Sequence, residues 1–389
     1  MIRSRQIAII EKYYQNFKDS LYDDVPAIHS EKLLEFQKTS FGEYAYQQNE
    51  IFNRWAYKVR PGNKRYYCVQ NEQVVGQQSA INIQIRLDSE VFNAAWAVDL
   101  RIRPEWKMKG LGVALVGQLI HEYDVLLGFG VSDDAYKMFV RQGWLDLGLI
   151  DALVKPLSMA GYNDKAPNAS FIAWFKYCAA LFVSTLSNYY RGMVHFILPN
   201  EFRKIGRFTQ EHEKLINNIC SADVIQINKN KDYYNWRFID FPGSGKYENY
   251  ELVKNATPVA FFSIAKATYE HMNVLAISEI QAKKSDLGII VDEIVRMALV
   301  KKVSKITYSG LDHEVLRVLK SRFFYSRPYG ERFLVFTKRS ELKSIIMDKR
   351  NWKISSSDSD AEYYLLHNNS LSHNEYPDSN PQKNGRCPV

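Results

Sequence analysis

The sequence predicts an α/β protein in which one structural unit is used twice. The chain has 389 residues, which is too long for one ordinary compact domain. The segment WAYKVRPG begins at Trp55, and the similar segment WRFIDFPG begins at Trp236, 181 positions later. The same order of predicted elements follows each segment. Self-similarity at a fixed spacing indicates a duplicated unit.

The elements of the first copy can be predicted in chain order. YYCVQN, from Tyr66, and VVGQQSAINIQI are rich in strand-forming residues, and the Asn-containing turn between them favours a hairpin. The segment 98–104, VDLRIRP, alternates apolar and polar residues like a strand. LGVALVGQLIHEY, from Leu111, has leucines at i+4 spacing and is predicted to be a helix. A short strand (125–130), a second helix (133–144) and a closing strand complete the copy.

The second copy repeats this order. The matching segments are YELVKN, PVAFFSIAKA, ISEIQA, the helix LGIIVDEIVRMAL, the strand KITYSG and the helix DHEVLRVLKSRFF. Asp99 lies 44 residues after Trp55, and Glu279 lies 43 residues after Trp236, so the central strands match in position. We therefore expect a mixed, mostly antiparallel sheet with flanking helices in each copy.

These elements divide the chain into four segments. We expect an N-terminal domain over residues 1–155, a linker with an apolar helix over 156–200, and a C-terminal domain over 201–345. The remaining residues, 346–389, are expected to form a tail with a disordered end, because its last part is polar and rich in turn-forming residues.

Several features bear on the compartment. The apolar stretch from Phe171 to Val183 is interrupted by Lys176 and is too short to span a bilayer, so we expect a buried or interfacial helix. The N-terminus has no apolar core or cleavage site typical of a secretory signal. The four cysteines form no CxxC motif, which favours a reducing compartment. We expect a cytoplasmic protein without stable membrane insertion.

The composition limits the classes of binding partner but does not select one class. Lysine and arginine total 51 against 43 acidic residues, a net charge of +8. This excess suits nucleic acid, anionic lipid or phosphorylated small molecules. The abundant aromatic residues are scattered and form no RNA-binding box, so we do not expect a nucleic-acid partner. The histidines show no metal-ligand spacing, and we expect no metal.

The segment with the clearest chemical signal follows the central strand of the first copy. Lys107-Met108-Lys109-Gly110 is a basic loop that leads into the helix beginning Leu111-Gly112-Val113. Backbone N–H groups at a helix N-terminus converge on one point, and the helix dipole favours an anion there. Glycines allow a phosphate to approach, and the lysines add positive charge. The pattern predicts a pyrophosphate site that is neither a Walker A motif nor GxGxxG.

This loop resembles that of the GNAT superfamily of acyl-CoA-dependent N-acyltransferases, which reads Arg/Gln-x-x-Gly-x-Gly/Ala. The sequence departs from it at Lys107, which keeps the charge. The resemblance implies two tandem GNAT-like domains. It also implies that acyl-CoA is held by the central strand and the loop, and the residues concerned are Leu100, Ile102, Lys107, Met108, Lys109, Gly110, Leu111, Gly112 and Val113.

Downstream, the resemblance continues in Ala135, Phe139 and Gly143-Trp144. The general acid usual in the family would fall at Phe139, which has no hydroxyl. Tyr136, about one turn earlier, is the substitute candidate for protonating the departing thiolate. In the second copy the loop reads QAKKSDLG, with one glycine and with Asp286 where an anion would sit. The resemblance therefore implies a degenerate second domain that does not bind CoA.

Asp99 is the candidate general base. Alternation along the strand places Val98, Leu100 and Ile102 on one face and Asp99 on the opposite, cleft-facing side. A carboxylate there could accept the proton of an attacking amine, directly or through water. It could equally be half of a structural ion pair. His29 is a further candidate, although a surface loop is its simpler reading, and the tail acids Asp358 and Asp360 are read as exposed by default.

The expected activity is transfer of an acyl group from CoA to an amine by direct attack, because the sequence has no GxSxG or Cys–His arrangement for a covalent intermediate. Tandem chains with a Trp-x5-Pro segment in each copy resemble bacterial enzymes that N-acylate nucleotide-linked amino sugars for surface polysaccharide. This implies an amino sugar, with a dTDP-3-amino-3,6-dideoxyhexose as the best candidate. A protein, peptide or antibiotic amine is the alternative, and a non-catalytic binding or membrane-peripheral protein is the second alternative.

Candidate acceptor-binding residues come from both copies. Trp55 and Trp236 are read first as core or junction aromatics and second as platforms for stacking a substrate. Arg237 follows the second tryptophan, and Asp23 and Asp24 lie in the polar loop before His29. If the second reading holds, the acceptor binds between the two domains.

Overall fold

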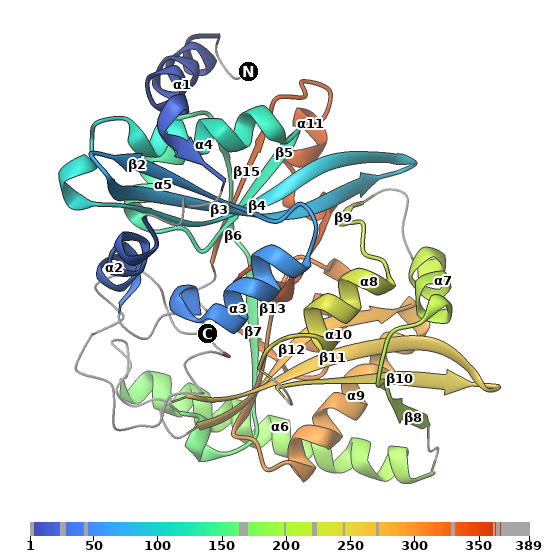
Figure 1. The fold of residues 1–389 in the computed structure, drawn as a ribbon. Helices are drawn as coiled ribbons and strands as arrows, with labels where there is room; N and C mark the ends of the chain where they lie inside the picture. The colour runs from blue at the N-terminus through green and yellow to red at the C-terminus, as the bar shows by residue number, and fades with distance from the viewer. Residues whose placement is uncertain are drawn as a thin grey trace.

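The structure is a computed structural model that describes residues 4–23, 29–42, 46–162, 170–197, 200–219, 224–243, 246–269, 272–327 and 331–360, together with Glu362 and Leu366. Two mixed sheets lie one above the other in Figure 1, each with helices packed on it. The described helices are α1 (Ser4–Phe17), α2 (Ser30–Phe41), α3 (Glu50–Asn53), α4 (Leu111–Glu122), α5 (Asp133–Arg141), α6 (Phe171–Ile197), α7 (Gln210–Ile219), α8 (Lys231–Tyr234), α9 (Lys284–Val300), α10 (His313–Ser321) and α11 (Lys343–Ile346).

The first sheet, in the upper half of Figure 1, contains the predicted hairpin and central strand of the first copy. Its neighbours pair antiparallel along the main path except for β4 and β5, which are parallel. The order is β1 (Leu21–Tyr22), β2 (Lys64–Gln70), β3 (Gln73–Leu87), β4 (Glu90–Ile102), β5 (Val125–Phe129), β15 (Arg332–Thr337) and β6 (Leu145–Leu149). Beside this path, β9 (Ile225–Ile227) pairs with β3, and β16 (Trp352–Lys353) pairs with β9.

The second sheet repeats the arrangement. β12 and β13 are its parallel pair, and the other pairs are antiparallel. The order is β14 (Tyr325–Ser326), β7 (Asp151–Pro156), β13 (Lys305–Gly310), β12 (Met272–Ala282), β11 (Thr257–Tyr269), β10 (Tyr247–Lys254) and β8 (Glu201–Lys204). The predicted mixed, mostly antiparallel sheet in each copy is confirmed.

Each sheet contains the last strand of the other copy, and the first sheet also contains β9 and β16 from the second half of the chain. β7 directly follows β6 in the chain, yet it lies in the second sheet between β14 and β13. Conversely, β15 directly follows β14 but lies in the first sheet between β5 and β6. The boundaries expected at residues 155 and 345 therefore do not separate the two sheets. The reason is that each copy ends in two strands, where the sequence predicted one closing strand, and the second of the two crosses to the other sheet.

The repeat spacing is visible in the packing at the junction. Asn49 accepts a hydrogen bond from the Phe52 N–H and caps α3, and Asn230 caps α8 in the same way, 181 residues later. Each helix continues into a π-helical turn that carries a tryptophan. Trp55 Nε1 donates to the Trp236 carbonyl at 2.8 Å, and Trp236 Nε1 donates to the Trp55 carbonyl at 3.0 Å.

These two tryptophans form the centre of a shared core. Their rings stack with centroids 4.8 Å apart and an interplanar angle of 11°. Both are buried in one hydrophobic cluster that includes side chains from both sheets. This arrangement agrees with the interpretation of Trp55 and Trp236 as core aromatics at the junction of the two copies. It does not agree with stacking of a substrate on them, because each ring already covers the other.

The apolar segment of the linker forms α6, which lies along the lower edge of the molecule in Figure 1. It packs against β7 of the second sheet and against α9, the helix on that sheet, and not across the junction of the two copies. Tyr177 donates to the carbonyl of Ser158, just after β7, and Ser184 donates to the carbonyl of Pro156, the last residue of β7. Among the described residues, no helix is both long enough and apolar enough to cross a bilayer.

The first part of the tail is ordered and buried. We name residues 354–360 the strap. The Leu311 N–H donates to the Ile354 carbonyl at 2.9 Å, and Ser357 Oγ donates to the Ser278 carbonyl at 2.7 Å. Asp358 and Asp360 are buried, so the default reading of them as exposed is wrong. Charged side chains are buried when the fold supplies partners, and the partners of this segment lie far away in the sequence.

Candidate functional site

The basic loop has the backbone that a helix N-terminal anion site requires. Gly110 is the N-cap of α4 and has φ +84°, a left-handed conformation that favours glycine. A Cβ at this position would also lie 2.0 Å from the ring of Tyr13 in α1. The predicted helix start is therefore confirmed, and glycine is needed there for two reasons.

The lysines of the loop lie at the surface on either side of this helix start. Lys107 Nζ is 3.4 Å from the carboxylate of Asp134, and Lys109 Nζ lies 4.7 Å above the Trp106 ring. Met108 between them is exposed and has φ +63°. The first N–H groups of α4 have no acceptor one turn earlier in the helix. Such a helix start favours an anion, and the two lysines lie in the loop that leads into it.

Gly112 has a different role from the one expected. A Cβ there would lie 2.9 Å from the Ile102 side chain and 2.9 Å from Met138 Sδ. The missing side chain thus allows α4 to pack closely on β4 and α5, rather than giving a phosphate access. Leu111 is fully buried, Val113 is half-buried, and Leu100 and Ile102 pack in the same cluster as α4.

The central strand is interrupted by a β-bulge at Asp99. Ser79 pairs with Val98, but Gln77 pairs with Arg101, so β4 contains one more residue than β3 over this stretch. Asp99 has φ +58°. The bulge changes the parity of the strand: Val98 packs in the junction core, whereas Leu100 and Ile102 pack on the α4 side. The single face expected for Val98, Leu100 and Ile102 is therefore wrong, because a bulge inserts a residue into the alternation.

The bulge directs the Asp99 carboxylate into a buried polar cluster. Tyr46 and Gln47, just before α3, donate to Oδ1 at 2.9 and 2.7 Å. Tyr57, in the π-helical turn after α3, donates to Oδ2 at 3.0 Å. Burial, and then the Asp99 charge, hold the pKa of Tyr57 well above its usual value. Tyr57 therefore stays a hydrogen-bond donor to the carboxylate.

The strap brings a second carboxylate to this cluster. Tyr46 Oη lies 2.9 Å from Asp99 Oδ1 and 3.3 Å from Asp360 Oδ2. The Arg237 guanidinium donates to the Ser359 carbonyl at 3.0 Å, and Tyr247 donates to Glu362 at 2.8 Å. The second copy thus holds the strap in place, and the strap places an acid beside the central strand of the first copy.

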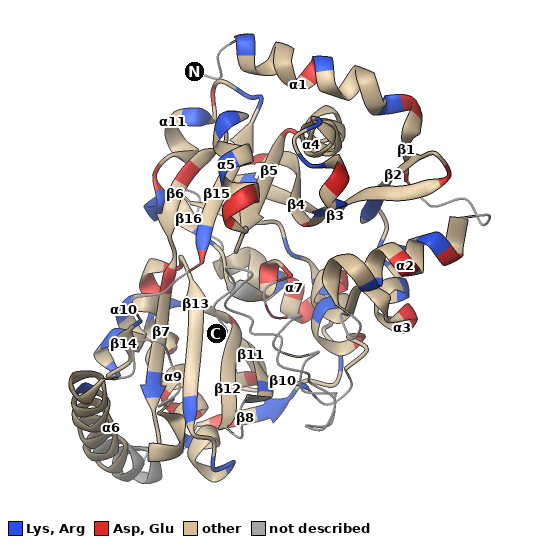
Figure 2. Ribbon diagram, turned by 90° about the vertical axis from the view of Figure 1, so that its left-hand side faces the viewer, with Lys and Arg blue, Asp and Glu red and all other residues tan. Residues whose placement is uncertain are grey.

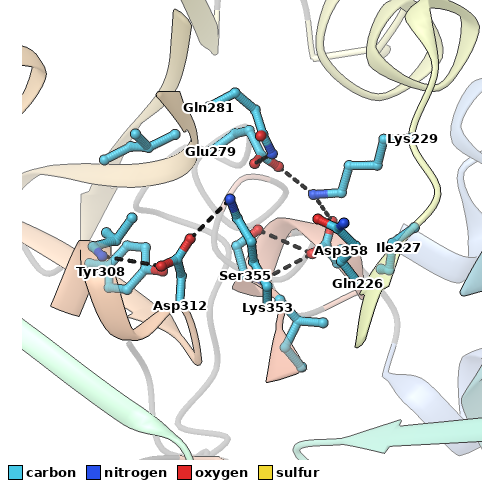
Figure 3. Close-up of a pocket in the computed structure, with 13 residues that line it drawn as sticks. Gln226, Ile227, Lys229, Glu279, Gln281, Tyr308, Asp312, Lys353, Ser355 and Asp358 are labelled. Carbon is cyan, nitrogen blue, oxygen red and sulfur yellow. Dashed lines mark hydrogen bonds and ion pairs between the residues drawn. The ribbon is translucent and has the colours of Figure 1, made fainter. Parts of the chain in front are cut away.

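The second copy has a corresponding acidic residue at its own bulge. The pairing of β11 with β12 shifts between Ser263 and Ile264, next to Glu279. Figure 3 shows Lys229 between Glu279 and Asp358 of the strap, at 2.5 and 2.6 Å. Burial raises the pKa of the Glu279 carboxyl. Burial alone would lower the pKa of Lys229, but the charges of Asp358 and Glu279 raise it well above its usual value.

These groups line a polar pocket between β9, β12, the end of β13 and the strap. Besides the triad just described, it contains the ion pair of Lys353 and Asp312, whose charged atoms lie 3.3 Å apart. β12 and β13 are paired only as far as Ile277 and Tyr308. Beyond these residues the two strands diverge, and the strap and the pocket-lining side chains occupy the space between them.

The start of α9 also differs from the start of α4. Lys283, not a glycine, is the N-cap. Asp286 in the first turn is buried, and its carboxylate is 2.5 Å from Lys254 Nζ. An acid therefore already interacts with the positive end of the helix dipole. In the second copy, Asp286 therefore lies where an anion would bind at the helix start, and the strap lies beside the diverging strands.

The Tyr136 hydroxyl is hydrogen-bonded to a partner outside the Asp99 cluster. Its hydroxyl donates to Asp146 Oδ2 at 2.9 Å, and the Arg332 guanidinium lies 4.7 Å above its ring. The hydrogen bond to the Asp146 carboxylate raises the pKa of the Tyr136 phenol. Phe139, at the position usual for the general acid, is buried and stacks on Trp144 with centroids 4.4 Å apart.

The remaining predicted residues do not gather around Asp99. Asp23 is exposed at the end of β1, and Asp24 lies outside the described residues. His29 is the N-cap of α2, and no hydrogen bond of its Nδ1 is found within the described part of the chain. Arg237 is buried against the strap. Within the same described part, no group of three or more His, Cys, Asp or Glu side chains could hold a metal ion.

Sequence reasoning missed several members of the cluster. Tyr46, Gln47 and Tyr57 flank the Asn-capped helix α3, and Lys229 directly precedes the Asn that caps α8. The signal that could have found them is the repeat itself, because the Asn that caps the short helix and the tryptophan after it recur at the same spacing in both copies.

No protein-family model and no curated protein matches the chain in sequence. Solved structures are similar in fold. A GCN5-related N-acetyltransferase from Anabaena variabilis is 10% identical, with a TM-score of 0.56 over 84% of this chain and 74% of that one. Saccharomyces cerevisiae N-myristoyltransferase with bound myristoyl-CoA is 12% identical, with a TM-score of 0.51 over 82% of each chain. A probable N-acyltransferase from Enterococcus faecalis is 8% identical, with a TM-score of 0.53 over 80% and 71%.

These likenesses show the fold. The chain is a mixed α/β protein built from two tandem GNAT-like domains, as the sequence predicted. The acidic cluster at the β4 bulge and the glycine-capped start of α4 both belong to the first of these domains.

Proposed function

We propose that the protein is an acyl-CoA-dependent N-acyltransferase whose donor site lies in the first domain. The observation that carries the proposal is the difference between the two copies. The first keeps a glycine-capped, lysine-flanked helix start after the strand that bears Asp99. In the second, Asp286 and the strap occupy the corresponding positions. The likeness to structures of acyltransferases, one with bound myristoyl-CoA, supports the same donor.

The chemistry follows from direct attack. The CoA pyrophosphate binds at the N-terminus of α4, and pantetheine runs between β4 and β5 beyond Trp96, the last β4 residue paired with β5. The amine nitrogen attacks the thioester carbonyl, whose oxygen is polarised by backbone N–H groups of β4. Asp99 accepts the amine proton, directly or through the Tyr46 or Tyr57 hydroxyl. The C–S bond then breaks, and the CoA thiolate leaves.

The proposed acceptor is the amine of a nucleotide-linked amino sugar, with a dTDP-3-amino-3,6-dideoxyhexose as the best candidate. Because Trp55, Trp236 and Arg237 are buried at the junction, they do not bind it. The pocket of the second domain is too small for a sugar, because its own ion pairs occupy it. The support for a hydroxylated acceptor is the set of polar groups around Asp99, which are the Tyr46 and Tyr57 hydroxyls and the Asp360 carboxylate.

A peptide or protein amine is the second candidate, and the likeness to N-myristoyltransferase favours it. A panel that crosses short and long acyl-CoA donors with nucleotide amino sugars and peptides separates the two. Release of free thiol, followed with Ellman's reagent, is the readout. Thiol release above the hydrolysis background with an amine is expected. No release with any pair would favour a non-catalytic binding protein.

Replacing Lys107 and Lys109 together with alanine is expected to weaken CoA binding about tenfold. An exposed ion pair contributes roughly 0.2–1 kcal/mol, so two such pairs approach the 1.4 kcal/mol that makes a factor of ten. Calorimetric titration with CoA measures both affinity and stoichiometry, which we expect to be one CoA per chain.

The matched control for this variant is the double alanine substitution of Lys283 and Lys284, the corresponding lysines at the start of α9. It should leave the affinity unchanged. Equal weakening by both double variants, or two CoA molecules per chain, would contradict the assignment of the donor site to the first domain alone.

Replacing Tyr136 with phenylalanine is expected to keep kcat within about threefold of wild type, well short of the loss of at least 100-fold typical for a general acid. The hydroxyl already donates to Asp146, and its raised pKa makes it a weaker acid. Water then protonates the leaving thiolate. Steady-state kinetics at saturating donor checks this, and a fall of 100-fold would restore Tyr136 as the acid.

A further inference from the structure

The outer face of α6 carries an apolar seam with a regular spacing. Alternate steps of three and four residues place apolar side chains along one line of the helix over five turns. These residues are Ile172, Phe175, Ala179, Phe182, Leu186 and Tyr189. We call this line the α6 seam. The exposed apolar face extends beyond this line to Phe171, Trp174 and Val183. The three–four repeat along the line itself is the spacing of a coiled-coil contact.

The seam points away from the rest of the molecule. Phe175, Phe182 and Tyr189 are 62%, 71% and 71% exposed. Tyr177 and Ser184, on the opposite side of the helix, are buried and donate to backbone carbonyls beside β7. These two hydrogen bonds fix the rotation of α6 about its axis, so the seam cannot turn inward.

The helix is also almost uncharged. Residues 171–197 include no aspartate or glutamate, and Lys176 and Arg191 are the only lysine and arginine. Figure 2 shows the described part of α6 almost entirely in tan. A helix meant to face water carries charged side chains on its outer face, and an interfacial helix that binds anionic lipid is rich in Lys and Arg along its polar flank. The α6 seam has neither.

The geometry points to a second copy of this chain as the partner, with the α6 seams of the two copies packed against each other. Such a contact is self-complementary and closes after two copies, as in most soluble oligomers. Lys176 follows Phe175 and therefore lies at the edge of the seam. There its methylene groups can cover the contact while its ammonium stays in water.

The exposed area is of the size that a stable dimer needs. An aromatic residue offers roughly 200 Å². With Phe171 at 77% exposure, the four exposed phenylalanine and tyrosine side chains near the seam present about 550 Å² per copy, or about 1,100 Å² for a pair. Ile172 and Leu186 add to this. Specific interfaces bury about 1,200–2,000 Å² in total, so the seam with its flanking residues reaches that range.

The test is sedimentation velocity of the full chain over a wide concentration range. Wild-type protein is expected to sediment as a dimer. Phe175→Ser with Phe182→Ser removes the two central aromatic side chains and should raise the dimer dissociation constant at least about 100-fold, which leaves monomer. Leu186→Ser is a second, milder variant. Because all three side chains point outward, circular dichroism and the melting temperature should show retained folding.

Met347→Ser is the matched control, because Met347 is 60% exposed but lies away from α6, at the end of α11. It should leave the dimer intact. Wild-type monomer at every concentration overturns the proposal, as does a double variant that stays dimeric. A monomer that co-sediments with phosphatidylserine vesicles, and loses this binding in the double variant, also overturns it in favour of a membrane surface.

Discussion

Replacing Asp99 with asparagine is expected to lower kcat about 100-fold and to leave CoA affinity little changed. The amine acceptor is mostly protonated at neutral pH, and some group must take its proton before or during attack. Asparagine keeps the size and the acceptor oxygen of the side chain but has no basicity. Steady-state kinetics and calorimetric CoA titration on the same preparation separate the two effects.

The geometry explains why the effect should fall on kcat. Tyr46 and Gln47 donate to Oδ1 of Asp99, and Tyr57 is the one donor to Oδ2 among the residues that the structure describes. A carboxylate has about four acceptor positions, so Oδ2 retains capacity for the proton of an amine or a bridging water. The glycine-capped loop proposed to bind CoA is formed by other residues of the chain, and Asp99→Asn does not alter it.

Asp360→Asn is the informative companion variant, because Asp360 shares the Tyr46 hydroxyl with Asp99. If Asp99→Asn stays within a few-fold of wild type, Asp99 is structural. A large loss of kcat in Asp360→Asn would then make the strap carboxylate the base. Loss of CoA affinity in Asp99→Asn would instead show that the bulge shapes the donor site, against the role proposed here.

Lys229→Met is expected to reduce the free energy of unfolding by about 3–5 kcal/mol, the usual effect of removing one partner of a buried ion pair. Lys229 is buried between Glu279 and Asp358, and methionine leaves two carboxylates facing each other without a cation. The Ser357–Ser278 contact next to them should loosen, and the strap should leave the second domain. Urea unfolding and limited proteolysis after residue 346 measure the two consequences.

Glu279→Gln is the matched control. Glutamine keeps the size of Glu279 and its capacity for hydrogen bonds, and Lys229 keeps its pair with Asp358. Burial raises the pKa of the Glu279 carboxyl, so its charge contributes less to stability than that of Asp358. We expect a change within about 1 kcal/mol, as for a hydrogen bond replaced by another. Equal destabilisation by Lys229→Met and Glu279→Gln would show that packing, not charge balance, holds the strap.

Part of the fold could be read directly from the sequence because the duplication leaves local signals. The tryptophan segments lie 181 positions apart, and the structure places Trp55 against Trp236 with reciprocal hydrogen bonds. The glycine-capped start of α4 was predictable for a different reason, since Gly110 and the basic loop are contiguous in the sequence.

The exchange of β7 and β15 had no such signal. Both are short, buried strands at the same place in their copies, and either sheet offers each of them an equivalent position. Only packing across the whole molecule selects the exchanged arrangement. The parity change at Asp99 was equally hidden, because a bulge depends on the register with β3 rather than on the residues of β4 alone.

The burial of the strap is a third feature that could not be predicted from the sequence. SSSDSD is a polar segment that favours a solvent-exposed turn. Its burial depends on Lys229, Arg237 and Tyr46, which lie more than 100 residues away. Predicting that burial requires the positions of these partners, which follow only from the assembled fold.

The strand exchange also sets the order in which the protein can fold. Phe129 of β5 pairs with Phe333 of β15, so the first sheet stays incomplete until about 200 further residues are synthesised. At ribosomal rates of about 5–20 residues per second, β5 waits roughly 10–40 s for its neighbour. During that time its free edge is a template for wrong pairing, and contacts of such long sequence separation form slowly. The two halves are thus one cooperative folding unit, and a chain cut between the sheets would yield two fragments that each lack an interior strand.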